Sequence, residues 1–196
     1  MTTTLFFILL AYLFGSFSSA IVASRLLGLP DPRTQGSGNP GATNVLRLGG
    51  KKAAIITLLG DAIKGVIPIL IAKACNLSEW GLGFTALAAF IGHLYPIFFQ
   101  FKGGKGVATA FGCWLALSWP IGLLLMGIWL GAAILFRYSS LAALISAMLA
   151  PFFYLFHPAL FIPLLLMSAL LIYRHKKNIQ NLLEKKEPTI GKSKSV

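Results

Sequence analysis

The hydrophobic positions of this chain fall into long runs that short polar segments separate. Three runs have the length of an ordinary membrane helix: about Leu5 to Leu27, Ala53 to Ala74 and Trp80 to Phe99. A bilayer core about 30 Å thick requires about 20 apolar residues per helix. Each of these runs therefore predicts one transmembrane span.

Two further apolar runs are too long for one span each, because Gly106 to Phe136 and Leu141 to Tyr173 both exceed thirty residues. Ser118-Trp119-Pro120 interrupts the first run and His157-Pro158 the second. Proline disfavours helix in the preceding residue and lacks an N–H donor. Each run therefore predicts two short helices. The fold class expected is all-α, a polytopic transmembrane bundle of seven spans in one domain over 1–183, followed by a short basic tail over 184–196.

Composition supports a membrane protein, since only 11% of the 196 residues are charged and 57% are hydrophobic. A soluble globular chain has about 25% charged residues. The net charge of +12 would suggest nucleic acid in a soluble protein, but here it fits the enrichment of Lys and Arg on the cytoplasmic side of spans. With seven spans, 15 of the 17 Lys and Arg lie in the segments that this arrangement places on the cytoplasmic side. We therefore expect an outside N-terminus, a cytoplasmic C-terminus, membrane lipids as neighbours and no nucleic acid partner.

The first polar segment combines glycines with hydrogen-bond donors. Glycines let the backbone approach a ligand, Ser, Thr and Asn add donors, and an Arg fork matches a phosphate. An ordinary turn before the second span is the alternative interpretation. The candidate residues are Ser37, Gly38, Asn39, Gly41, Thr43, Asn44 and Arg47.

The second segment places two lysines around two glycines, at Lys102, Gly103, Gly104 and Lys105. Such a loop before a helix suits a phosphate, because backbone N–H groups and the helix dipole favour an anion there. It is not a Walker A loop, since Gly106 follows Lys105 where Ser or Thr is required. A flexible, positively charged connection is the alternative.

The third segment, Arg174 to Asn178, is basic, as topology alone requires at the inner end of a span. His175 and Asn178 are one helical turn apart and can share a face. His93, near the inner end of the third span, can reach the same cavity.

Two further features lie inside spans. Asp61 and Lys64 can neutralise each other one turn apart and support the site residues from behind. Gly127 and Gly131 form a GxxxG pattern, which we interpret as close helix packing inside the bundle.

Other chemistries find little support. Cys75 and Cys113 are isolated, no metal-ligand spacing occurs, and we expect neither metal nor cofactor. The polar segments are rich in cations and poor in carboxylates, which favours binding of one or two phosphate groups. An organic-phosphate transporter would need the same charge, but no inverted repeat is visible.

Four runs, SGNPGATNVLR, GDAIKG, GHLYPIFFQFKGGKGVAT and HKKNI, resemble the bacterial acyl-phosphate:glycerol-3-phosphate acyltransferase family over nearly the whole chain. The resemblance implies acyl transfer from acyl phosphate to glycerol 3-phosphate, giving lysophosphatidic acid and inorganic phosphate. It implies a multi-pass protein of the bacterial inner membrane with a cytoplasmic active site, and a soluble enzyme supplying acyl phosphate as a possible partner.

In the mechanistic hypothesis, the cations bind the two substrate phosphates, and neutral hydrogen-bond donors stabilise the oxyanion that develops on the acyl carbonyl. Either a substrate phosphate accepts the hydroxyl proton, or His93 or His175 acts as general base. The expected catalytic residues are Ser37, Asn39, Thr43, His93, Lys105 and His175. The expected substrate-binding residues are Gly38, Gly41, Asn44, Arg47, Lys102, Gly103, Gly104, Ser140 and Asn178.

Overall fold

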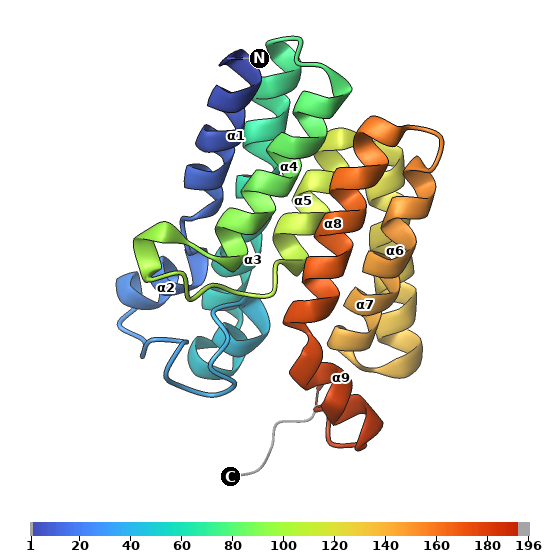
Figure 1. The fold of residues 1–196 in the computed structure, drawn as a ribbon. Helices are drawn as coiled ribbons and strands as arrows, with labels where there is room; N and C mark the ends of the chain where they lie inside the picture. Colours follow the sequence, from blue (N-terminus) through green and yellow to red (C-terminus); the bar gives the residue numbers. More distant parts are fainter. Residues whose placement is uncertain (1, 192–196) are drawn as a thin grey trace.

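A computed structural model describes residues 2–191, and within them it is helical without strands. Residues 192–196, the end of the expected basic tail, lie outside the described residues. Two 3₁₀ turns, Ile97–Phe99 and Ala150–Tyr154, accompany the α-helices (Figure 1). The α-helices are α1 (Thr2–Gly15), α2 (Ser19–Leu26), α3 (Ala42–Ala74), α4 (Glu79–Leu94), α5 (Val107–Leu117), α6 (Trp119–Phe136), α7 (Ser139–Leu149), α8 (Pro158–Arg174) and α9 (Lys176–Leu183).

Both predicted breaks in the long apolar runs are confirmed. Ser118 ends α5 and precedes α6, and His157 precedes α8. Pro120 and Pro158 lie in the first turns of their helices, where a missing N–H costs no hydrogen bond. Each run therefore forms two helices, as its prolines indicate.

Four helical stretches have the length and apolar composition to cross a membrane: Thr2–Leu26, Ala42–Ala74, Glu79–Phe99 and Trp119–Phe136. α8 and α9, which are bent by 57° relative to each other, make a fifth only when they are counted as one span. α5 and the stretch Ser139–Tyr154 are shorter apolar helices. These lengths and compositions indicate a multi-pass membrane protein.

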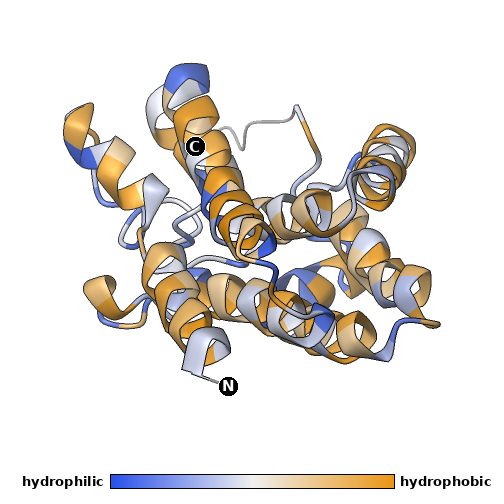
Figure 2. Ribbon diagram, turned by 90° about the horizontal axis from the view of Figure 1, so that it is seen from above, coloured by the Kyte–Doolittle hydropathy of each residue, from blue (hydrophilic) through white to orange (hydrophobic). Residues whose placement is uncertain are grey.

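The outward faces of the helices are strongly apolar, and Figure 2 shows hydrophobic residues over most of the helical ribbon. Ile134 and Leu135 on α6 are 70% and 74% exposed, and Phe6 on α1 is 60% exposed. Contiguous exposed apolar surface of this extent marks an interaction site in a soluble protein. Here it matches the hydrocarbon of a bilayer.

The first span consists of two helices rather than one, because α1 ends at Gly15 and α2 begins at Ser19. The break frees backbone carbonyl groups from the helix. The Lys64 ammonium donates a 2.8 Å hydrogen bond to the Phe17 carbonyl oxygen at this point. A buried cation of α3 therefore stabilises the interruption.

The first two predicted spans leave a polar segment between them, residues 28–52, whose second half already belongs to α3. Gly50 interrupts this helix with φ 72° and ψ −170°. A positive φ carries no penalty for glycine. The kink separates a polar first part, which contains Thr43, Asn44 and Arg47, from the apolar part that spans the membrane.

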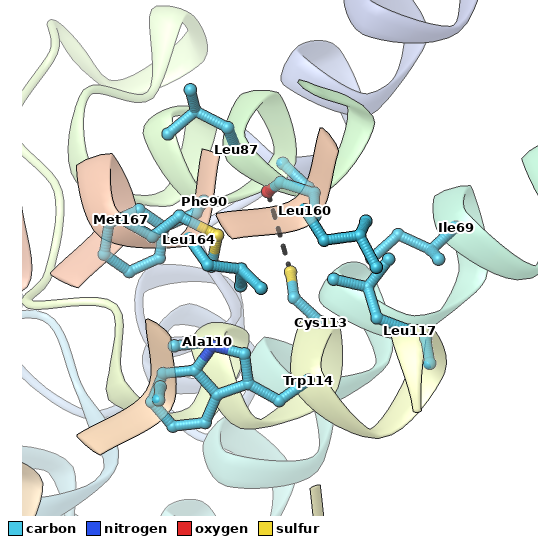
Figure 3. Packing of buried hydrophobic residues seen from close by; sticks show 14 of the residues in the cluster. Ile69, Leu87, Phe90, Ala110, Cys113, Trp114, Leu117, Leu160, Leu164 and Met167 are labelled. Atoms are coloured by element: carbon cyan, nitrogen blue, oxygen red, sulfur yellow. Dashed lines mark hydrogen bonds between the residues drawn. The ribbon is translucent and has the colours of Figure 1, made fainter. Parts of the chain in front are cut away.

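α4 forms the centre of the bundle and packs against α1, α3, α5 and α8. Its Phe90 lies in a cluster with Trp114 of α5 and Met167 of α8 (Figure 3). The Cys113 thiol lies 3.6 Å from the Ala86 carbonyl oxygen and is free, as is Cys75. Cys113 is buried and packs as a small apolar residue, whereas Cys75 is exposed.

Glycines bring α1 and α4 into backbone contact. A Cβ atom at Gly15 would overlap the Ala89 carbonyl, and one at Gly92 would overlap the Tyr12 carbonyl. The predicted packing role of Gly127 and Gly131 is wrong, because a Cβ atom at either has nothing within 4 Å among the described residues. These two glycines face the outside of the bundle.

We expect Gly92→Leu to lower the apparent melting temperature in detergent micelles, because the α1 backbone blocks the added side chain. Overpacking of this kind costs about 1–3 kcal/mol or more. Gly127→Leu is the matched control and should change stability by less than about 0.5 kcal/mol. Equal effects of the two substitutions would contradict the assignment of the α1–α4 contact.

Candidate functional site

The three polar segments singled out in the sequence lie at one end of the bundle. The α2–α3 connection, the α4–α5 connection and the α8–α9 bend occupy the end opposite the N-terminus (Figure 1). The α6–α7 connection at Arg137 and Tyr138 lies at the same end. Residues far apart in the sequence therefore form one polar face.

The side chain of Asn44 organises the α2–α3 connection. Its carbonyl oxygen accepts a 2.9 Å bond from the Ser37 N–H. Its amide donates to the carbonyl oxygens of Pro32 and Gln35 at 2.9 and 3.0 Å. Because the amide is buried and fully engaged, Asn44 shapes the loop around Ser37, Gly38 and Asn39. Its predicted contact with substrate stays a prediction.

The α4–α5 connection packs tightly through its two central glycines, which are buried. A Cβ atom at Gly103 would overlap the carbonyl oxygen of His93. One at Gly104 would overlap the His93 ring and approach the Pro40 carbonyl oxygen to 3.0 Å. The N–H of Gly104 donates to the His93 carbonyl at 3.2 Å. The two loops therefore meet at Gly104, over the end of α4.

Arg174 fixes this glycine pair from α8. Its Nε donates to the Gly104 carbonyl oxygen at 3.1 Å, and its Nη2 donates to that of Gly103 at 2.7 Å. The guanidinium carbon lies 5.5 Å from the centre of the Tyr95 ring. Sequence reasoning explained Arg174 by topology alone. A basic residue in a basic run gives no signal that it binds backbone carbonyls.

Lys105 lies half-buried where several charges converge. Burial lowers its pKa below the ordinary 10.5, and Glu187 opposes this shift. The nearby cations Arg174, Arg47 and Lys177 lower the pKa of Lys105 further. Residues from all three predicted segments therefore share one electrostatic environment, which is suited to an anion.

Glu187 is the carboxylate that this environment contains, and sequence reasoning missed it. Its Oε1 accepts bonds of 2.5 Å from the Ser140 hydroxyl and 2.7 Å from the Asn178 amide. Its Oε2 accepts from Asn181 at 3.3 Å. Ser140 and Asn178, both predicted to bind substrate, are therefore brought together by a carboxylate from the chain after α9. No pattern in the charged tail distinguished this glutamate.

His175 lies at the bend beyond the end of α8 and is 2% exposed. Its Nδ1 lies 2.8 Å from the Leu171 carbonyl oxygen, so Nδ1 carries the proton and Nε2 holds the free electron pair. Burial lowers the pKa of His175 to about 4, and nearby Lys105 contributes to the shift. The ring is therefore neutral at pH 7.

Asp61, Lys64 and His93 form a buried network below the loops. Lys64 Nζ lies 2.9 Å from Asp61 Oδ1, as predicted for residues one turn apart. His93 Nδ1 lies 3.6 Å from the same oxygen, and the other edge of the ring faces Gly104. The network therefore connects α3 and α4 to the loop that carries Lys105.

The remaining predicted residues have looser positions. Ser37, Gly38, Thr43, Arg47 and Lys102 are exposed, and Asn39 and Gly41 are half-buried. In the described part of the chain, the side chains of Ser37, Thr43 and Lys102 make no hydrogen bond, although the Ser37 N–H donates to Asn44. Across residues 2–191, no three His, Cys, Asp or Glu side chains are placed to share a metal ion.

Fold and site together define a multi-pass membrane protein with a cationic cluster where its loops meet. The family model described as glycerol-3-phosphate acyltransferase matches residues 5–185. A glycerol-3-phosphate acyltransferase of Methylococcus capsulatus is 59% identical over 92% of this chain and 93% of its own length. One of Shewanella woodyi is 53% identical over 98% and 96%. The chain belongs to the glycerol-3-phosphate acyltransferase family and is an acyltransferase.

Solved structures agree with this assignment. The crystal structure of PlsY, an integral membrane glycerol 3-phosphate acyltransferase, in its glycerol 3-phosphate form has a TM-score of 0.91 and 42% identity, over 96% of each chain. The lysophosphatidic acid form has a TM-score of 0.86 and 40% identity over the same shares. The family resemblance seen in the sequence is confirmed, and membership favours an enzyme over the alternative of a transporter.

We expect Asp61→Asn to destabilise the protein by about 3–5 kcal/mol, because it leaves the buried Lys64 ammonium without its carboxylate. Unfolding by sodium dodecyl sulfate in mixed micelles, followed by tryptophan fluorescence, measures the change. The double variant Asp61→Leu/Lys64→Met removes both charges but also the donor to the Phe17 carbonyl, so it should recover only part of the loss. A double variant markedly less stable than Asp61→Asn would show that the unpaired Lys64 charge is not the main source of the loss.

Proposed function

We propose that this acyltransferase uses acyl phosphate as donor and glycerol 3-phosphate as acceptor, and releases lysophosphatidic acid and inorganic phosphate. The convergence of Arg47, Lys105 and Lys177 in one environment supports this proposal most directly. Both substrates are phosphates, one soluble and one a lipid. A cationic site at the end of a lipid-exposed bundle is accessible to both.

The reaction requires positioning more than strong acid or base chemistry. The glycerol 1-hydroxyl oxygen attacks the acyl carbon and forms the ester bond, and the bond from that carbon to the phosphate oxygen breaks. Cations that hold both phosphates convert this encounter into a step within one complex. In this proposal Ser37, Arg47, Lys102, Lys105 and Asn178 hold the phosphates, and Ser140, Gly38, Gly41, Gly103 and Gly104 complete their binding. His175, expected from the sequence to share this task, offers an acceptor at Nε2 instead of a donor.

Neutral donors then stabilise the charge that develops on the carbonyl oxygen. Asn39 belongs to the loop that meets Gly104, and Thr43 lies in the first turn of α3 directly after it. Backbone N–H groups beside the glycines add to these donors. Charge also develops on the departing phosphate, which Lys105 is placed to neutralise. Asp61 and Lys64 support the loop from below, through His93.

The hydroxyl proton passes to a substrate phosphate in this mechanism. A general base is most effective when its pKa lies near the working pH. His175 has the required free Nε2, but its pKa of about 4 makes it a weak base at pH 7. Its neutral ring suits acceptance of a hydrogen bond from the substrate better than removal of its proton.

The seven-span arrangement extends this proposal to the membrane. The two confirmed breaks divide the chain into helices that run alternately between the ends of the bundle (Figure 1). Arg25, Arg47, Lys105 and Arg174 lie toward one end, which the charge rule assigns to the cytoplasm. The N-terminus is then outside the inner membrane of the bacterial cell. The site opens to soluble glycerol 3-phosphate and to a soluble enzyme that supplies acyl phosphate.

Purified protein in lipid nanodiscs should form lysophosphatidic acid and inorganic phosphate in equal amounts from a long-chain acyl phosphate and glycerol 3-phosphate. Lys105→Ala should lower kcat/KM by about 100-fold or more, because it removes a cation from both phosphates. Thin-layer chromatography and a phosphate assay measure the two products. Lys52→Ala, which removes an exposed cation of α3, is the matched control.

Two results would contradict this proposal. Product formed from acyl-CoA but not from acyl phosphate would refute the assigned donor. Uptake of glycerol 3-phosphate into sealed vesicles without acyl transfer would support a transporter in place of the enzyme.

The lowered pKa of Lys105 predicts a pH dependence of binding. As pH rises, Lys105 loses its proton at a lower pH than an ordinary lysine does. Affinity for glycerol 3-phosphate should therefore decrease with rising pH before pH 10.5 is reached. Lys105→Arg should keep its affinity over the same range, because an arginine stays charged. Titration calorimetry measures both proteins without turnover. Lys52→Arg should follow the wild type, and a matching loss in Lys105→Arg would exclude Lys105 as the titrating group.

A further inference from the structure

Both hydrogen bonds of the Arg174 side chain go to the backbone of the α4–α5 connection. Its two donors reach the carbonyl oxygens of consecutive residues, Gly103 and Gly104, at 2.7 and 3.1 Å. A planar guanidinium presents two N–H groups in a fixed fork, which a lysine cannot imitate. The contact therefore fixes the rotation of two successive peptide groups.

The orientation of these peptide groups determines what the loop presents on its other side. The carbonyl and the N–H of one planar trans peptide point in opposite directions. With the Gly104 carbonyl directed to Arg174, the N–H of Lys105 points away from it. The N–H of Gly104 is held by the His93 carbonyl at 3.2 Å. Among the described residues, the N–H of Lys105 makes no hydrogen bond.

Arg174 is itself held in place from a third element. Its guanidinium lies 5.5 Å from the centre of the Tyr95 ring, at the end of α4. The carbonyl oxygen of Tyr95 accepts a 2.9 Å hydrogen bond from the Tyr12 hydroxyl of α1. Helices α1, α4 and α8 therefore determine together where the guanidinium lies.

We propose that Arg174 is a positioning residue, which holds the Gly103 and Gly104 carbonyls so that the N–H and side chain of Lys105 face the substrate phosphate. This inference rests on the proposed function, since it assigns the phosphate to the Lys105 side of the loop. Arg174 acts through the loop and need not touch the substrate. Its role differs from that of Lys176, an exposed cation two residues further on.

Steady-state kinetics of Arg174→Gln, Arg174→Lys and the control Lys176→Gln test the proposal. Arg174→Gln should lower kcat/KM for glycerol 3-phosphate by about 100-fold, the size expected when a reacting group is misplaced. Arg174→Lys should lower it by about tenfold, because it retains one of two charge-assisted bonds. Lys176→Gln should stay within about twofold of wild type, as removal of an exposed charge predicts. Ethylguanidinium added to Arg174→Ala should restore about tenfold.

Hydrogen–deuterium exchange separates positioning from general destabilisation. In Arg174→Gln, exchange should rise in the peptide covering 100–109 and stay unchanged in α3 and α6. Inorganic phosphate should protect this peptide in the wild type and not in the variant. Unchanged exchange in the loop, or kinetics equal to those of Lys176→Gln, would overturn the proposal. Loss of protection throughout the chain without rescue by ethylguanidinium would overturn it in favour of a purely structural role.

The kinetic and the exchange measurements together also distinguish this proposal from the function on which it rests. A wild-type protein that makes no product would refute the proposed reaction. Exchange with and without inorganic phosphate would still decide whether Arg174 presents the loop to a phosphate.

Discussion

A carbonyl group released from a helix inside an apolar bundle must find a donor, because lipid supplies none. In this protein long cationic side chains supply it at three places. Lys64 binds the Phe17 carbonyl where α1 and α2 separate, and Lys73 binds the Leu117 carbonyl at 2.8 Å where α5 ends. Arg174 binds the carbonyls of Gly103 and Gly104. The α4–α5 loop of the candidate site can depart from helical geometry because Arg174 satisfies two of its carbonyl groups.

This requirement divides the cations of the site end into two groups. Arg174 and Lys64 are occupied by the protein's own oxygen atoms and hold the scaffold. Lys105 and Arg47 make no side-chain hydrogen bond among residues 2–191, so their charge is available to an external anion. A lysine or arginine therefore stabilises the fold where a free backbone carbonyl lies within reach, and can bind a ligand where none does. Burial first, and then the neighbouring cations, lower the pKa of Lys105.

Much of the fold could be predicted from the sequence, because hydrophobic run length and proline position depend on local physics. The breaks at Ser118 and His157 and the Asp61–Lys64 pair are examples. The interruption after Gly15 was missed because its stabilising partner, Lys64, is remote in sequence. Arg174 and Glu187 were missed for the same reason. Gly127 and Gly131 show the opposite error, since a local pattern indicated packing that the outward orientation of α6 does not provide.

The tail that follows α9 ties the site end together across a long stretch of chain. Glu187 accepts from Ser140, 47 residues earlier, and the Ile190 N–H donates to the Arg137 carbonyl at 2.7 Å. Both partners of the α6–α7 connection are therefore synthesised after α7, α8 and α9. The polar end of the bundle is complete only once the chain has been translated through Ile190.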